Sequence, residues 1–150
     1  MTRVFLDANI LIAASVQDGP ARELMALAEQ HSNVTLLTNE YGLDEAERFV
    51  QRFRSEAHAD FLERREQVRA CADPTDQTKM LVIAYLPRGV RLPRKDLPIM
   101  AGAVSIGADW LVTRDREDFG PLYGKTVLGV EVVRSGTARA RLEQSAKRNS

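Results

Sequence analysis

Short apolar segments alternate with segments of helical periodicity along the chain, and this alternation limits the fold more than any other feature. Apolar and β-branched residues predict four strands, over about residues 3–7, 33–38, 109–115 and 126–133. Helical spacing of apolar side chains predicts helices over about residues 8–15, 20–31, 40–70, 76–86 and 96–108. Strands that alternate with helices favour an α/β fold with a mostly parallel sheet.

The size of the chain indicates one domain. Its 150 residues are 44% hydrophobic and 28% charged, which is ordinary for a folded globular protein. We expect residues 1–134 to form the domain and the polar residues 135–150 to form a frayed tail. No segment has the pattern of a secretion signal or of a membrane span, and the single cysteine, Cys71, excludes an internal disulfide and a cysteine-rich zinc site. We therefore expect a cytoplasmic protein with no membrane contact.

The apolar segment "RVFLDANILIAAS" contains an acid, Asp7, at the predicted end of its strand. A buried carboxylate costs free energy unless a hydrogen-bond partner or a cation compensates it. Two interpretations follow, because an Asp at this place also serves as the cap of the next helix. Asp7 is either a helix cap or a metal ligand.

Further acids follow the other predicted strands. Glu45 lies on the helix after the second strand, Asp96 opens a helix of small residues, and Asp115 and Asp118 follow the third strand. In parallel α/β sheets, functional groups gather beyond the carboxyl ends of the strands. Oxygen ligands without Cys or His select hard cations, so we expect Mg²⁺ or Mn²⁺.

Each of these acids also has a purely structural interpretation. Asp96 would gain from the helix dipole, and Asp115 and Asp118 flank a turn where acids are common. Glu45 lies in the charged run "LDEAER", where a solvated helix face is the default, and Glu40 and Asp44 are rivals for its role. The joint placement of the acids, and no single one of them, favours a functional site.

Basic residues flank the predicted acidic site. The net charge is +0, with 21 basic and 21 acidic residues, so a nucleic-acid partner would have to contact a local basic patch. Such residues precede Asp96 and bracket Asp115: Arg88, Arg91, Arg94, Lys95, Arg114 and Arg116. They would hold the phosphates of a nucleic acid, preferably single-stranded RNA, although an arginine-rich loop is also common as a solvated segment.

Two segments together resemble a known family. "VFLDANIL" and "KDLPIMAGAVSIGADWLVTRDREDF" are similar to the PIN domain, and the resemblance extends over about residues 3–133. It implies an α/β/α sandwich whose mostly parallel sheet has about four to five strands. It also implies a Mg²⁺- or Mn²⁺-dependent ribonuclease, and many small prokaryotic members are VapC-like toxins of toxin–antitoxin pairs.

The resemblance assigns roles to individual residues. Asp7, Glu45, Asp96 and Asp115 match the family's acids, which hold the metal and carry the catalysis. Asn9, Thr113 and Asp118 match auxiliary positions of the same site. The basic segment "PRGVRLPRK" before Asp96 departs from the commonest toxin pattern and looks closer to the stand-alone predicted PIN nucleases.

We therefore expect an endoribonuclease that cleaves phosphodiester bonds with metal-activated water. An antitoxin partner is an expectation from the family, and the stripe of Phe49, Phe53 and Phe61 would either pack internally or form a homodimer face. The alternative is a PIN-like nucleic-acid-binding or scaffolding module with little catalytic activity. Phosphatases that need two acids two residues apart fit poorly, because Asn9 stands at the second position.

Overall fold

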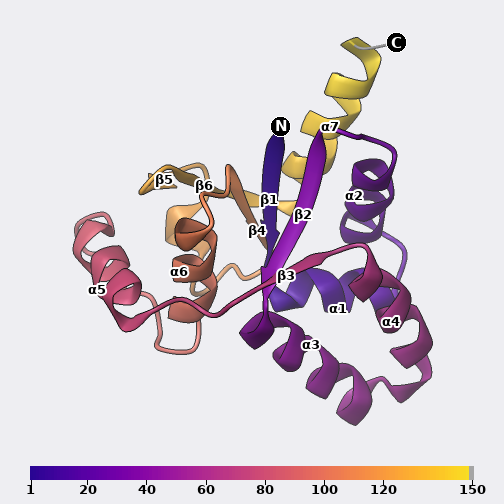
Figure 1. Ribbon diagram of the computed structural model, residues 1–150, viewed down its shortest axis with the longest axis horizontal. Coiled ribbons are helices and arrows are strands. Elements are labelled where there is room, and N and C mark those ends of the chain that lie inside the picture. Colours follow the sequence, from indigo (N-terminus) through magenta and orange to yellow (C-terminus); the bar gives the residue numbers. More distant parts are fainter. Residues whose placement is uncertain (149–150) are drawn as a thin grey trace.

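The computed structural model describes residues 1–148, which form one six-stranded sheet between helices (Figure 1). The strands are β1 Thr2–Leu6, β2 Val34–Asn39, β3 Arg69–Cys71, β4 Trp110–Thr113, β5 Thr126–Val127 and β6 Val130–Arg134. Their order across the sheet is β3-β2-β1-β4-β6-β5. All neighbours are parallel except β5 and β6, which form an antiparallel hairpin.

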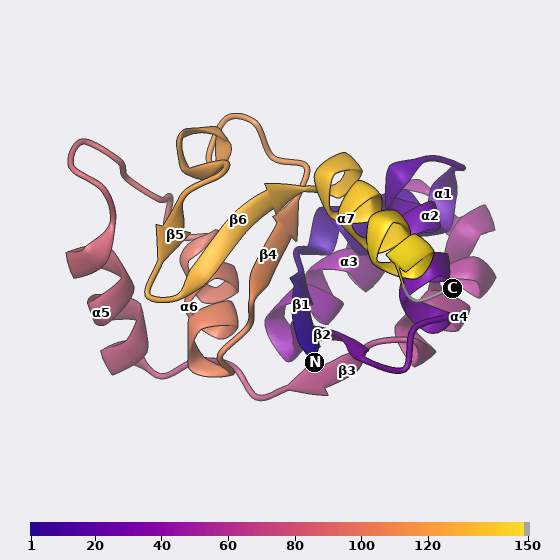
Figure 2. The same ribbon diagram turned by 90° about the horizontal axis from the view of Figure 1, so that it is seen from above.

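Helices cover both faces of the sheet. They are α1 Ala8–Val16, α2 Pro20–Glu29, α3 Glu40–Phe53, α4 His58–Glu66, α5 Asp76–Tyr85, α6 Leu97–Ser105 and α7 Ser135–Arg148. Helices α5 and α6 lie on one side of the sheet, and the other five lie on the opposite side (Figures 1 and 2). The described residues also include two short 3₁₀ turns, Ser55–Ala57 and Gly120–Leu122. No helix in the described part of the chain is both long and apolar enough to cross a membrane.

The alternation of side chains along β1 divides the core into two halves. Val4 and Leu6 are buried against α1 and α2, whereas Phe5 is buried against α6 on the opposite face. Successive strand residues point to opposite faces of a sheet, so a strand covered on both sides is apolar throughout. This explains why the strand segments have continuous apolar sequences.

The sequence correctly predicts the α/β/α sandwich with its mostly parallel sheet, although the sheet has six strands where four to five were expected. One addition is β3, a three-residue edge strand without a clear apolar pattern. The other arises because the single strand expected over residues 126–133 is a hairpin. Leu128 and Gly129 both have positive φ, at 49° and 87°, which forms the tight turn between β5 and β6.

The carboxyl-terminal segment corrects the expectation of a frayed tail over residues 135–150. Residues Ser135–Arg148 form helix α7, which packs against α2, and residues 149–150 lie outside the described part. Ala138 and Leu142 are four residues apart, so they share one helix face and are buried in the core. Arg139 binds Glu23 of α2 at 2.9 Å. Because charged residues surround these two apolar positions, the sequence shows no clear apolar stripe of helical spacing here.

Parallel pairing brings the ends of β1, β2 and β4 to one edge of the sheet. Helix α6 approaches this edge closely, because Gly102 packs against Asn39 and Phe5 with no room for a Cβ atom. The Asn39 side chain caps α3 by accepting a bond from the Gly42 N–H at 2.9 Å. It also donates to the carbonyl of Pro98 at 3.0 Å, so the start of α3 is fastened to the start of α6.

Candidate functional site

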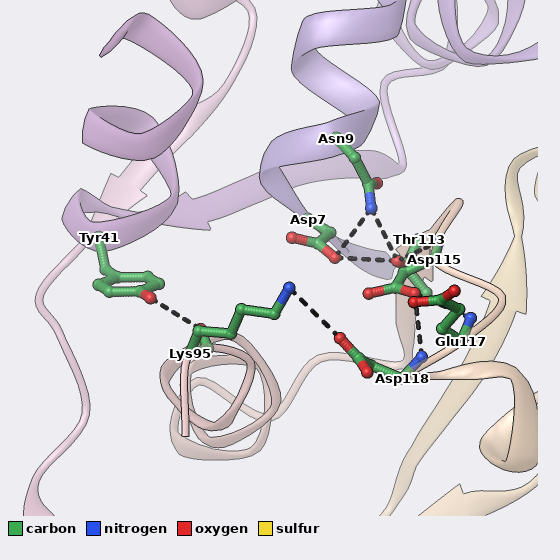
Figure 3. A network of polar contacts seen from close by, with 8 residues as sticks. All are labelled: Asp7, Asn9, Tyr41, Lys95, Thr113, Asp115, Glu117 and Asp118. Atoms are coloured by element: carbon green, nitrogen blue, oxygen red, sulfur yellow. Dashed lines mark hydrogen bonds and ion pairs between the residues drawn. The ribbon is translucent and has the colours of Figure 1, made fainter. Parts of the chain in front are cut away.

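Asp7 lies immediately after β1, and its carboxylate is held by three hydrogen bonds. Oδ2 accepts from the Thr113 hydroxyl at 2.9 Å and from the Asn9 amide at 3.3 Å (Figure 3). Oδ1 accepts from the N–H of Ala8 at 2.7 Å. Asp7 is only 5% exposed. Burial raises the pKa of Asp7 to about 6, although the hydrogen bonds from Thr113 and Ala8 lower it. The negative charges of Glu45 and Asp115 also raise it. Asp7 therefore caps α1 and is also electrostatically part of an acidic site.

Asn9 and Thr113 connect the ends of β1 and β4. The Asn9 amide nitrogen donates to Thr113 Oγ1 at 3.2 Å, and its oxygen accepts from the N–H of Arg114 at 3.1 Å. Thr113 Oγ1 also accepts from the N–H of Asp115 at 3.1 Å. Asn9 and Thr113, two of the three residues that the resemblance assigned to auxiliary positions, thus contact the acids or their loops.

Three carboxylates come together beside Asp7. Asp96, Asp115 and Asp118 each offer an oxygen within 4.8 Å of the other two. Asp115 Oδ1 accepts from the N–H groups of Glu117 and Asp118, both at 3.0 Å, which folds this loop back toward α6. These bonds confirm Asp115 as a turn former, while its role as a metal ligand stays a prediction. Asp118, expected to be only auxiliary, is one of the three acids whose oxygens lie within 4.8 Å of one another.

Asp96 is the most unusual acid of the group. It is 8% exposed, and its Oδ2 atom is buried without a hydrogen-bond partner among the described residues. It precedes α6 but makes no side-chain capping bond to it. Burial and the adjacent Asp118 carboxylate raise the pKa of Asp96 well above its usual range, whereas the pKa of the half-buried Asp118 is lowered. A carboxylate oxygen without a donor calls for a proton or a cation.

Lys95 provides one cation within this site. Its Nζ lies 3.5 Å from Asp118 Oδ2, and its backbone carbonyl accepts a 2.7 Å hydrogen bond from the Tyr41 hydroxyl (Figure 3). The negative charges of Asp96 and Asp118 raise the pKa of Lys95. This side chain, which the sequence placed with the nucleic-acid-binding residues, thus faces the carboxylates.

Glu45 projects from α3 toward the same region. Its charge contributes to the raised pKa values of Asp7 and Tyr41, while partial desolvation raises the pKa of Glu45 itself. Among the described residues, Glu40 and Asp44 have smaller effects on the pKa of Asp7 than Glu45 has. The electrostatics therefore favour Glu45 over its two rivals, although Asp7 and Glu45 lie outside the 4.8 Å group.

The remaining basic residues lie on two sides of the acids. Arg88, Arg91 and Arg94 are exposed on the segment between α5 and α6. Arg114 and Arg116 follow β4 and line a hollow beside the acidic site. These positions agree with a basic rim, and the loop of Arg88, Arg91 and Arg94 has no ion pair within the described residues.

Sequence reasoning missed Tyr123, which supports the loop of Asp115. Its hydroxyl donates to the carbonyl of Asp115 at 3.0 Å and lies 3.4 Å from that of Thr113. Tyr123 follows the 3₁₀ turn Gly120–Leu122, and no local pattern distinguishes it from an ordinary loop tyrosine. Only the return of the chain beside β4 brings its ring to this place.

The donor set fits a hard divalent cation. The group contains carboxylate oxygens only, from the start of α6 and from the loop after β4. Mg²⁺ and Mn²⁺ prefer such ligands. A cation would also satisfy the buried Asp96 oxygen, which finds no donor in the described part of the chain.

Comparison with known proteins agrees with this architecture. A family model described as "PIN domain" matches residues 3–117. Among solved structures, PAE2754 from Pyrobaculum aerophilum is similar with a TM-score of 0.66 and 19% identity, over 95% of this chain and 96% of that one. No curated protein sequence matches the chain.

Two further structures share the fold. VapBC2 from Rickettsia felis, solved with a DNA fragment from its promoter, has a TM-score of 0.63 and 16% identity, over 89% of this chain and 98% of that one. VapC20 from Mycobacterium tuberculosis, described as a sarcin–ricin loop cleaving toxin, has a TM-score of 0.55 and 14% identity, over 83% and 98%. The family match covers most of the chain, as the resemblance in its sequence predicts, and the chain belongs to the PIN-domain nuclease family.

Proposed function

We propose that this protein is a metal-dependent endoribonuclease that hydrolyses phosphodiester bonds at the carboxyl edge of its sheet. The observation that carries the proposal is the meeting of Asp96, Asp115 and Asp118 within 4.8 Å, with a buried Asp96 oxygen that lacks a donor in the described chain. Clustered carboxylates repel one another, so their arrangement is stable only with a proton or a cation among them.

The ligands of the cation are part of the proposal. Asp96, Asp115 and Asp118 would hold Mg²⁺ or Mn²⁺, with Asp7 and Glu45 contributing directly or through water. A bound divalent cation would supply an activated water at neutral pH and neutralise charge on the phosphate. Because Asp7 accepts three hydrogen bonds, its carboxylate is fixed in orientation before any ligand arrives.

RNA is the proposed substrate. One structural relative, VapC20, is described as cleaving the sarcin–ricin loop, which supports RNA as the class of substrate. The exposed arginines at positions 88, 91 and 94 would hold phosphates against the repulsion of the carboxylates. We infer single-stranded RNA, since an unpaired strand has unstacked bases and a flexible backbone that enter a groove more readily than a duplex.

A toxin–antitoxin role is the proposed biological setting. It rests on relatives such as VapBC2 and VapC20, whose similarity to this chain lies in the fold. Expression of the wild-type protein should arrest bacterial growth, and co-expression of a small DNA-binding protein encoded beside it should relieve the arrest. Growth unaffected by the active nuclease would refute the toxin role and leave a stand-alone nuclease.

A homodimer is also proposed, through the exposed stripe on α3. Phe61 is fully buried within the subunit, but Phe49 and Phe53 are 40% and 59% exposed, and their tilted rings contact each other at 5.1 Å between centroids. Sedimentation velocity of the wild type and of Phe53→Glu tests the dimer. A monomer for the wild-type protein would refute it.

One observation favours the alternative of a weakly catalytic binding module. Lys95 already pairs with Asp118 at 3.5 Å and so competes with a divalent cation for the site. Calorimetric titration with Mn²⁺ separates the two functions, because a nuclease site must bind the ion and an inactive module need not.

The decisive experiment measures cleavage of single-stranded RNA with Mg²⁺ or Mn²⁺ by the wild type, Asp96→Asn and Asp115→Asn. We expect a loss of about a hundredfold or more in each variant, since removal of one metal-holding group typically costs several kcal/mol of transition-state stabilisation. Asp60→Asn is the matched control, because Asp60 is exposed in the first turn of α4, away from the site. Undiminished cleavage by both site variants would refute the proposal.

A further inference from the structure

A second hollow, of about 620 Å³, adjoins the acidic site and is lined by arginines without any carboxylate. It lies between the end of β4, the ring of Tyr123 and the first turn of α7. Strand β6 runs beside β4 and leads directly into α7, which brings the start of this helix next to the end of β4 (Figure 2). The four arginines of the lining are Arg114, Arg116, Arg134 and Arg139.

Thr113 belongs to both the hollow and the acidic site. It lines the hollow, and its hydroxyl donates to Asp7 at 2.9 Å and accepts from the N–H of Asp115 at 3.1 Å. The hollow and the acidic site therefore lie next to each other at the end of β4.

Most of the positive charge in the hollow is not neutralised by the protein. Arg114, Arg116 and Arg134 form no ion pair within residues 1–148. Arg139 differs, since it binds Glu23 at 2.9 Å. The Arg134 guanidinium lies 4.7 Å from the centre of the Tyr123 ring, a cation–π contact that holds it in place. Three arginines gathered in one hollow without acids favour an anionic ligand.

Ser135 adds a hydrogen-bonding hydroxyl to the lining of the hollow. It is 9% exposed, lines the hollow, and its hydroxyl has no hydrogen-bond partner in the described part of the chain. As the first residue of α7, it stands where backbone N–H groups have no partner within the helix. This hydroxyl is free to donate a hydrogen bond to an oxygen atom of a bound ligand.

We propose that this hollow is a phosphate subsite, which binds the backbone phosphate of a nucleotide next to the cleaved bond. The inference rests on the proposed nuclease function and names the residues that hold the flanking strand: Arg114, Arg116 and Arg134, with Ser135. Nucleic acid carries a phosphate at every nucleotide, so a strand seated on the acids presents one beside Thr113. The contact is independent of base sequence, because it involves the backbone alone.

The test measures binding of a short fluorescein-labelled oligouridylate by anisotropy, in EDTA, over a range of salt concentrations. We expect Arg134→Gln and Arg116→Gln each to weaken binding about three- to tenfold and to lower the salt slope by about 0.7. Arg134→Lys should retain most of the affinity, since it keeps the charge. Arg3→Gln is the matched control, because Arg3 is exposed on β1 and lies outside the lining of the hollow.

Three results would overturn the subsite. They are equal binding by the wild type and both glutamine variants, no binding by the wild type, and displacement of the oligonucleotide by a polyglutamate peptide more readily than by inorganic phosphate. The last result would assign the hollow to an acidic protein partner. The assay contains no divalent cation, so it measures RNA binding without cleavage. If the protein bound RNA through Arg134 but failed to cleave it with Mg²⁺ or Mn²⁺ present, the nuclease function would be refuted and the subsite would remain supported.

Discussion

Thr113 Oγ1 donates a hydrogen bond of 2.9 Å to Asp7 Oδ2, across 106 residues of sequence. The same oxygen accepts from the N–H of Asp115 at 3.1 Å. One hydroxyl thus joins the first acid of the chain to the loop that carries Asp115 and Asp118. The ends of β1 and β4 are held together at the point where the proposed site requires a fixed geometry.

Replacing this hydroxyl should therefore loosen the site. Thr113→Val keeps the shape of the side chain but leaves the Asp115 N–H without its acceptor and removes a bond that lowers the pKa of Asp7. We expect a loss of about 1–3 kcal/mol in the free energy of unfolding and weaker Mn²⁺ binding. Urea denaturation in EDTA and calorimetry measure the two effects. Thr35→Val on β2 is the control, and wild-type Mn²⁺ affinity in Thr113→Val would contradict the expectation.

The raised pKa of Asp7 predicts that the metal-free protein loses stability as the pH rises. Its folded pKa of about 6 exceeds the ordinary value of 3.8, so the folded state holds this proton more tightly. The contribution of Asp7 to the free energy of unfolding is fully present below about pH 4 and is lost as the pH rises through 6. The difference corresponds to at most about 3 kcal/mol above pH 7.

Asp7→Asn removes this titration and should gain stability relative to the wild type as the pH rises from 4.5 to 7.5, with EDTA present. Urea midpoints at the two pH values measure the change, and Asp60→Asn controls for the loss of one charge. Wild-type and Asp7→Asn proteins with parallel pH profiles would show that burial of Asp7 costs nothing.

Lys95 should compete with a divalent cation. Its ammonium lies 3.5 Å from Asp118, so its removal leaves the carboxylates with less positive charge among them. We expect Lys95→Gln to bind Mn²⁺ about three- to tenfold more tightly, which corresponds to about 1 kcal/mol for one partly exposed charge. Lys79→Gln on α5 is the control, because Lys79 pairs with Asp76 instead. Weaker Mn²⁺ binding by Lys95→Gln would show that Lys95 supports the ion and does not replace it.

Helix α7 should be essential to the stability of the fold. Leu142 is buried in the core between α7 and its neighbours. Leu142→Ala should lower the free energy of unfolding by about 2–4 kcal/mol, the usual cost of a buried leucine truncation. Gln144→Ala, at an exposed position of the same helix, should change it by no more than about 0.5 kcal/mol. Urea denaturation compares the two, and equal stabilities would place α7 outside the core.

The layers of the fold and most of the candidate residues follow from the amino-acid sequence alone. Apolar strands such as "RVFL" alternate with helical segments, and this pattern requires a parallel sheet covered on both faces. The acid at the end of such a strand, Asp7, was conspicuous because a carboxylate in a buried segment needs compensation.

Which of these groups come into contact depends on how the chain folds. Asp118 belongs with Asp96 and Asp115, Lys95 faces the carboxylates, and Tyr123 supports their loop. Local periodicity reports which face of an element is buried, but these contacts join residues whose separation depends on strand order and loop path. For the same reason, the polar sequence of residues 135–148 was interpreted as part of a frayed tail. Its two buried residues become a core stripe only when α2 lies beside them.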